Sequence, residues 1–265
     1  MELRTVTVTR YVTPLREGGS LPAIVEADDE GLYVLKFRGA GQGPKALVAE
    51  LIAGEIARAL GLCVPEIVLA ELDPDLARTE PDPEIQQLIR ASGGLNLALD
   101  FLPGAATFDP LADRVDADPA SRIVWFDALV SNVDRSPRNT NMLVWHKRLH
   151  LIDHGAALYF HHAWDGYRER CTDPFARSAD HVLLPFAPAI AAVDAELAAR
   201  LTPARIEAIV AAVPPAWLAG EAFGDAAALR AAYLDYLCCR LQPPRAFAAQ
   251  AQRAHAALAE AAHAR

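Results

Sequence analysis

In the first part of the chain, apolar and polar residues alternate in short runs, and turn-forming residues lie between these runs. Neighbouring side chains on a β-strand point to opposite faces, so this alternation predicts strands rather than helices. We expect them at residues 5–12, 23–27, 32–37, 64–72 and 95–101.

Apolar residues with helical spacing follow the third of these runs. They extend from Pro44, which suits a first helical turn, to Gly61, which suits a helix stop. A shorter helix is expected at residues 83–90. The alternating pattern ends at Leu102-Pro103-Gly104, which we take as the boundary between two lobes.

Beyond that boundary the pattern is mainly helical and rich in alanine. It predicts a helix over 121–133 capped by Ser121, and two short strands, 141–146 and 150–153, around a Lys147-Arg148 turn. The expected fold class is α+β. An N-terminal lobe, residues 1–103, has antiparallel strands and one main helix, and a mostly helical C-terminal lobe, residues 104–265, carries the hairpin.

Composition narrows the class of protein. Hydrophobic residues make up 52% of the 265 positions, which is enough for a sizeable core. The net charge of −9 and the lack of a Lys/Arg cluster disfavour binding to nucleic acid. No apolar run is long enough to cross a membrane and no signal peptide begins the chain, so we expect a cytoplasmic protein without a membrane partner. The cysteines, expected to be buried and reduced, are Cys63, Cys171, Cys238 and Cys239.

One polar segment carries the chemistry. Asp134 is followed five residues later by Asn139 in a loop, and the predicted hairpin then leads to Asp153-His154-Gly155. Phosphoryl transfer needs a carboxylate for the proton of the attacking hydroxyl, and oxygen ligands for Mg²⁺. The hairpin can bring Asp153 beside Asn139, so the segment predicts an ATP- and Mg²⁺-dependent phosphotransferase.

A lysine in an apolar strand adds to this hypothesis. Lys36 lies at the end of the third predicted strand, where it either protects a strand edge or reaches nucleotide phosphates. A helix glutamate is its expected partner. On a helical wheel Glu55 lies within the apolar stripe and Glu50 lies opposite, so burial alone favours Glu55.

Glycines between the first two strands form another candidate site. Gly18, Gly19 and Ser20 would let backbone N–H groups approach phosphate oxygens, or they form an ordinary hairpin turn. No Gly-Lys-Ser/Thr sequence follows them, so the loop is not a Walker A motif.

Taken together, these segments resemble the HipA-like kinase family over about residues 18–157. The resemblance implies a two-lobed protein-kinase-like fold, Mg-ATP binding and transfer to Ser or Thr of a protein. It implies that Lys36 holds phosphates, Asp134 is the catalytic aspartate, and Asn139 and Asp153 bind Mg²⁺. It also implies Glu50, not Glu55, as the partner of Lys36. Further residues that it assigns to the nucleotide are the glycine-loop residues Gly18, Gly19 and Ser20 and the hinge residues Asp100, Phe101 and Leu102.

The sequence departs from the family in places. The chain is shorter than HipA, His154 stands where many protein kinases have Phe, and only Ser20 roughly matches HipA's phosphorylated loop serine.

The phospho-acceptor stays open. An aminoglycoside-type kinase for small molecules is an alternative, since Asp109, Asp113, Asp116 and Asp118 could attract a cationic substrate or could form a solvated loop. A non-catalytic nucleotide-binding interaction module is a third hypothesis.

Overall fold

The alternating segments form a closed β-barrel in the computed structural model, which describes residues 2–15, 21–41, 43–219 and 223–263. Its neighbours follow the order β1-β2-β3-β5-β4. All neighbouring pairs are antiparallel except β1 and β4, which run parallel and close the barrel. The strands are β1 (Thr5–Pro14), β2 (Ala23–Ala27), β3 (Leu32–Lys36), β4 (Ile67–Leu72) and β5 (Gly94–Asp100). Inward-facing apolar side chains fill the barrel with a core of its own.

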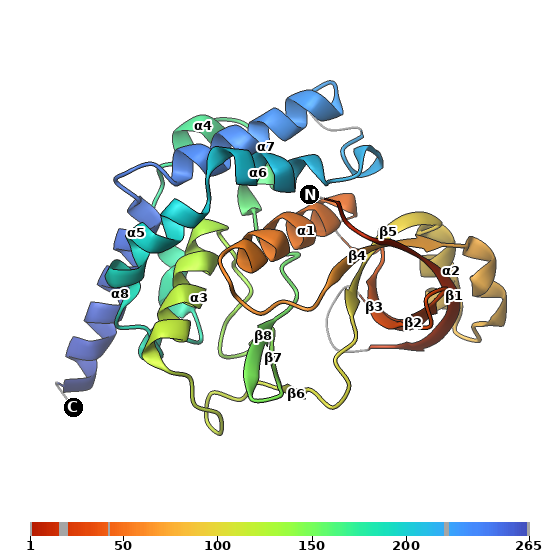
Figure 1. Ribbon diagram of the computed structural model, residues 1–265, viewed down its shortest axis with the longest axis horizontal. Helices are drawn as coiled ribbons and strands as arrows, with labels where there is room; N and C mark the ends of the chain where they lie inside the picture. The colour runs from red at the N-terminus through yellow and green to blue at the C-terminus, as the bar shows by residue number, and fades with distance from the viewer. Residues whose placement is uncertain (1, 16–20, 42, 220–222, 264–265) are drawn as a thin grey trace.

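Helix α1 (Pro44–Ala59) connects the barrel to the rest of the molecule. Proline occupies its first turn, as the sequence predicts, and its residues from Leu47 to Ala57 are all buried. Figure 1 shows α1 between the barrel and the helical part. On the barrel's outer side lie α2 (Pro83–Ala91), capped by Asp82, and a short 3₁₀ helix at Pro74–Thr79.

The rest of the chain is helical around a small sheet, β6-β7-β8. Its strands are β6 (Ala106–Thr107), β7 (Met142–Trp145) and β8 (Arg148–Leu151). Its helices are α3 (Ala117–Leu129), α4 (Tyr167–Arg170), α5 (Ile190–Arg200), α6 (Pro203–Ala211), α7 (Ala226–Arg240) and α8 (Ala246–His263). Within the described ranges no helix is long and apolar enough to span a bilayer.

A second, larger core joins α1 to the C-terminal helices. Two hydrogen bonds tie the same parts together. Trp217 donates its ring N–H to the Leu95 carbonyl at 3.0 Å, and Arg200 donates to the Leu60 carbonyl at 2.7 Å. Residues that precede the predicted lobe boundary therefore pack within the core of the helical part, which fixes α1 relative to the hairpin.

Two local predictions are wrong. Ser121 does not cap α3, because the helix begins one turn earlier and the Ser121 hydroxyl donates to the Ala117 carbonyl at 2.7 Å inside it. The turn of the hairpin is His146-Lys147 rather than Lys147-Arg148. Both residues have positive φ, 47° and 61°, as a two-residue hairpin turn that follows strand twist requires.

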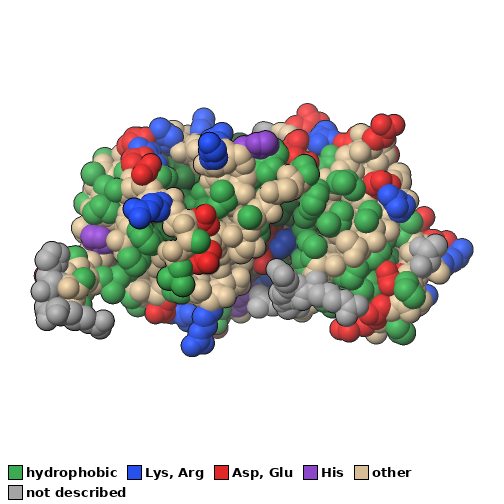
Figure 2. Space-filling model, turned by 90° about the horizontal axis from the view of Figure 1, so that it is seen from below, with side chains coloured by type: hydrophobic (Ala, Val, Ile, Leu, Met, Phe, Trp, Pro, Cys, Tyr) green, Lys and Arg blue, Asp and Glu red, His purple; other side chains and the backbone are tan. Residues whose placement is uncertain are grey.

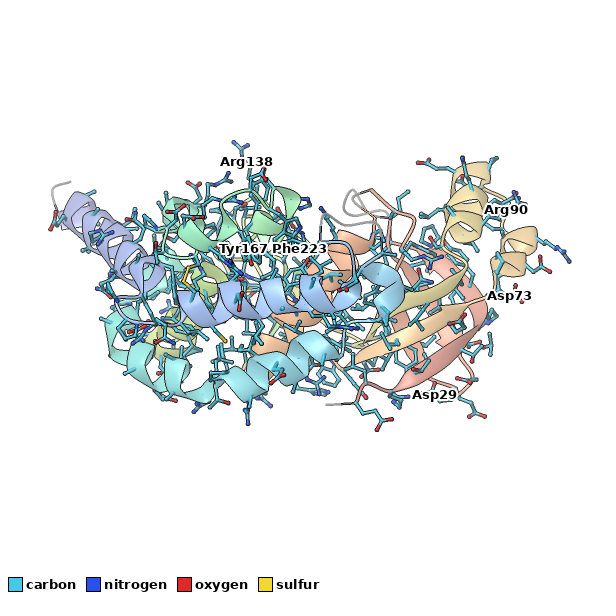
Figure 3. All side chains as sticks on the ribbon, turned by 90° about the horizontal axis from the view of Figure 1, so that it is seen from above. Asp29, Asp73, Arg90, Arg138, Tyr167 and Phe223 are labelled. Atoms are coloured by element: carbon cyan, nitrogen blue, oxygen red, sulfur yellow. A yellow bond between two sulfur atoms is a disulfide. The ribbon has the colours of Figure 1, made fainter. Side chains whose placement is uncertain are left out.

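The expectation that all cysteines are reduced is also wrong. A disulfide, the yellow bond in Figure 3, joins Cys171 to Cys239. Cys63 and Cys238 are free. The two partners lie 68 residues apart in the sequence, and only the packing of α4 against α7 brings them together. Spacing between neighbouring cysteines could not reveal this pair.

Candidate active site

A largely covered lysine marks the junction of the two parts. Lys36, the last residue of β3, has only 11% of its side chain exposed. Its Nζ lies 2.8 Å from Asp153 Oδ1 and 3.9 Å from Glu50 Oε2. Three elements thus meet at one cation: β3, α1 and the segment after β8. Seen from below, the furrow between the larger and the smaller part holds acidic and basic side chains close together (Figure 2).

The acids keep this lysine charged. Burial lowers the pKa of Lys36, but Glu50, Asp153 and Asp134 offset that effect and leave the pKa above its ordinary value. Burial likewise opposes the ionised form of Glu50, yet Lys36 and His154 bring the pKa of Glu50 well below its ordinary value. The Lys36 cation and the Glu50 anion are therefore held side by side, both largely shielded from solvent.

Of the two candidate glutamates, the structure brings Glu50 to Lys36. Glu55 instead lies 3.6 Å from Arg58 on the next turn, and burial raises the pKa of its carboxyl. The helical wheel pointed to Glu55 because it assumed one buried face, whereas α1 is enclosed on all sides. On such a helix a polar face can meet other protein groups rather than water.

His154 connects the glutamate to the Asp-His-Gly segment. Its Nδ1 lies 3.2 Å from the second oxygen of Glu50, and its ring packs edge-on against Phe126 with centroids 5.7 Å apart. The side chain is fully buried. Asp153, just before it, has a φ of 56°, an uncommon conformation for a residue other than glycine that is often found at functional sites. The segment is thereby anchored on α1 while Asp153 points to Lys36.

The loop after α3 places Asp134 at the same site. Its carboxylate accepts the side-chain amides of Asn139 at 2.9 Å and Asn141 at 3.2 Å. Asn141 also donates to the Asp134 carbonyl at 2.8 Å, which fixes the loop to the start of β7. The Asp134 carboxylate also contributes to raising the pKa of Lys36, after Glu50 and Asp153.

The structure thus gathers Lys36, Glu50, Asp134, Asn139 and Asp153 around one site. The predicted hinge lies at the exit from the barrel. Asp100 ends β5, Phe101 donates its N–H to the Leu32 carbonyl at 2.9 Å, and Leu102 is buried. Gly18, Gly19 and Ser20 lie outside the described residues, so their predicted contact with phosphates stays a prediction.

Sequence reasoning missed two groups of residues. Asn141 repeats the residue type of Asn139 two positions later, and that repeat was the available signal. The other group is a set of buried polar residues beneath the loop, among them Asp127 and Arg135. An aspartate among the apolar residues of a predicted buried helix was the signal for it.

The candidate metal ligands at this site suit a hard cation that binds together with a nucleotide. The two carboxylates and two amides supply only oxygen ligands, and Mg²⁺ commonly takes one or two carboxylates and completes its shell with phosphates and water. In the described part of the chain no three His, Cys, Asp or Glu side chains cluster to hold a metal ion without such help.

Comparison with solved structures gives the fold. The kinase CtkA of Helicobacter pylori, described as proinflammatory, aligns with a TM-score of 0.52 and 12% identity over 96% of this chain and 99% of its own. The Golgi casein kinase with Mn/ADP bound aligns with a TM-score of 0.46 and 11% identity over 92% of this chain and 74% of its own. No curated protein matches the sequence. The CtkA alignment, together with the β-barrel and the helical C-terminal part, confirms the predicted kinase-like fold.

The sequence model of one family also matches. It is described as HipA-like kinase and covers residues 8–232, which includes most of the barrel, α1, the catalytic loop candidate and most of the C-terminal helices. This span confirms the resemblance inferred from the motifs and extends it beyond residue 157. The chain therefore belongs to the HipA-like kinase family.

Proposed function

We propose that this kinase transfers the γ-phosphoryl group of Mg-ATP to a serine or threonine hydroxyl of a protein. The observation that carries the proposal is Lys36, only 11% exposed, held between Glu50 and Asp153 and within the electrostatic reach of Asp134. A buried cation with convergent carboxylates at a junction of two parts of a molecule is what phosphate binding and transfer require.

Each side chain has a separate role in the proposal. Lys36 binds phosphate oxygens, and Glu50 and His154 keep it in place. Asp134 orients the acceptor hydroxyl and takes its proton as the oxygen bonds to the γ-phosphorus. The bond from that phosphorus to the bridging oxygen breaks, and ADP leaves. Asn139 and Asp153, with Asn141 close by, would hold Mg²⁺, which neutralises charge on the phosphates.

Nucleotide binding is tested first. Mg-ATP at 100 times its dissociation constant should raise the unfolding free energy by about 2.7 kcal/mol, measured as a shift in melting temperature. Asp153→Ala should reduce the part of this gain that depends on Mg²⁺. If millimolar Mg-ATP leaves the melting temperature of the wild-type protein unchanged, the proposal is wrong.

Transfer is tested with labelled ATP, alone and with cell lysate, followed by mapping of the modified residues. Asp134→Asn should keep the thermal shift and reduce the rate of transfer by about 10²- to 10⁴-fold, because it cannot accept the proton. The matched control is Asp75→Asn, since Asp75 is exposed on the short 3₁₀ helix outside the barrel and belongs to neither the proposed site nor the acidic patch at residues 109–118. Equal rates in the Asp134 variant and the wild type would remove Asp134 from its role.

The structure also bears on the acceptor. Several of the acidic residues that could attract a cationic small molecule already have partners. Asp118 pairs with Arg122 at 2.8 Å, and the carboxylates of Asp109 and Asp113 accept backbone N–H groups within their own loop. This favours a protein acceptor. An aminoglycoside added in place of lysate tests the small-molecule alternative, and binding without any transfer would point to a non-catalytic module.

A further inference from the structure

A fully buried carboxylate lies beneath the proposed catalytic loop. Asp127, near the end of α3, accepts hydrogen bonds from three separate side chains. Asn132 donates at 2.8 Å to one oxygen, and Arg135 Nε and His181 Nε2 lie 2.6 and 2.9 Å from the other. Leu183 donates its N–H to His181 Nδ1 at 3.0 Å, which leaves the proton of the neutral ring on Nε2, facing Asp127.

Two branches run from this carboxylate to the site. On one, Asn132 accepts the backbone N–H of Asp134 at 3.1 Å. On the other, Arg135 donates to the carbonyl of Asn141 and, at 3.5 Å, to that of Ile152. Ile152 directly precedes Asp153, so the two branches reach both carboxylates that the proposed reaction uses.

Asp127 is ionised in this network. Burial opposes ionisation of Asp127, but Arg135 and His181 lower its pKa far below the ordinary value, so the group stays an anion. A buried ion pair adds little net stability compared with apolar residues of similar size, and in some proteins such pairs instead specify one geometry. The directed bonds of Asn132 and Arg135 point to that second use here.

We propose that Asp127 is a positioning residue of this kinase: through Asn132 and Arg135 it fixes where Asp134 lies relative to Asp153. The inference rests on the proposed function for its effect on rate, although the positioning itself is a property of the chain. Asp127 touches neither acceptor nor nucleotide in this scheme.

The test replaces the ion pair with apolar residues of similar size, Asp127→Leu with Arg135→Met. Its control, Asp235→Leu with Arg168→Met, removes the exposed ion pair between α7 and α4, in which Arg168 Nη2 lies 3.3 Å from Asp235 Oδ2. Backbone hydrogen exchange of residues 132–141 and 150–153 is measured in both, together with kcat and the KM for ATP.

In the test variant exchange in these segments should rise by about tenfold and kcat should fall by about 100-fold, with a smaller change in KM. The control should change neither. Unchanged exchange in the folded test variant would overturn the inference, and so would an unchanged kcat despite raised exchange. An equal fall in kcat and an equal rise in exchange in the control would also overturn it. If wild-type protein shows no transfer at all, the proposed function fails, while exchange still decides whether Asp127 positions the loop.

A second variant guards against a test protein that does not fold. Asn132→Ala keeps the Asp127–Arg135 pair but removes both the acceptor of the Asp134 N–H and the donor to Asp127 Oδ1. Exchange at the Asp134 amide should rise and kcat should fall by about tenfold, while the melting temperature falls because Asp127 Oδ1 loses its donor. A folded Asn132→Ala protein with wild-type kcat and exchange would overturn the inference as well.

Discussion

Among single residues, Glu50 shows how burial and charge oppose each other. The Glu50 carboxyl is buried on α1, and the loss of hydration opposes its ionised form. Lys36 and His154 contact its two oxygens and bring its pKa from 4.5 to about 2. Glu55, one and a half turns away, has only Arg58 and its pKa moves upward instead. The same residue type on the same helix thus has opposite effects on folding.

The Glu50 pKa predicts acid sensitivity. Because the folded-state pKa is below the unfolded one, Glu50 contributes stability above pH 4.5, and that contribution disappears as pH falls towards 2. The contribution at neutral pH is on the order of 3 kcal/mol. In urea titrations, the unfolding free energy of Glu50→Gln should be lower than that of the wild type at pH 7. It should also fall less between pH 7 and pH 3.

Glu55→Gln is the matched comparison and should behave in the opposite way. A raised folded-state pKa means that the ionised carboxylate is disfavoured by folding, so removing it should raise the unfolding free energy above pH 4.5. If both variants lose stability equally at neutral pH, the assignment of Glu50 rather than Glu55 to the lysine has no energetic basis.

At the scale of elements, the close approach of α1 to the barrel sets the site. Gly54 permits that approach: a Cβ there would lie 2.5 Å from Cδ1 of Ile67 on β4 and 3.8 Å from Nδ1 of His154. Ile67 is on β4, which is joined through β5 to β3, the strand that ends at Lys36. Because α1 carries Glu50, any shift of α1 away from the barrel would also move Glu50 away from Lys36.

Gly54→Ala therefore tests two opposing effects. Alanine favours a helix by about 1 kcal/mol over glycine, whereas forcing a methyl group into a packed core costs about 1–3 kcal/mol. We expect a net loss of unfolding free energy in urea titration and weaker binding of nucleotide. Ile67→Val removes the obstructing methyl, so the double variant should recover more stability than additive effects allow. If the change in unfolding free energy of the double variant equals the sum of the two single changes, the contact between residues 54 and 67 does not limit the approach of α1.

At the scale of the whole molecule, one covalent link joins distant segments. The Cys171–Cys239 disulfide ties the segment after α4 to the end of α7 across 68 residues. Air-oxidised protein should show two free thiols in a thiol titration under denaturing conditions, matching Cys63 and Cys238. Replacing both bridged cysteines with alanine should lower the unfolding free energy by about 2–4 kcal/mol. Cys63→Ala with Cys238→Ala is the control, and four free thiols in the wild type would contradict the link.

The order of strands and helices followed from the sequence because it depends on local periodicity, which a single sequence records. Lys36, Asp134, Asn139 and Asp153 stood out because each is polar beside an apolar strand or within a turn. What escaped prediction is non-local. The bond from Asp127 to His181 spans 54 positions, and the burial of Glu50 depends on helices that follow it by more than a hundred residues. Pairings of that kind depend on tertiary packing, which periodicity does not record.

The parallel pairing of β1 with β4 has one more effect. Because it closes the barrel, the described strands of that sheet have no free edge on which another polypeptide could add a strand. The small sheet is also partly covered, since β8 bridges to Cys63. Strand addition by another polypeptide is therefore confined, among the described strands, to the edge of the small sheet at the two-residue strand β6.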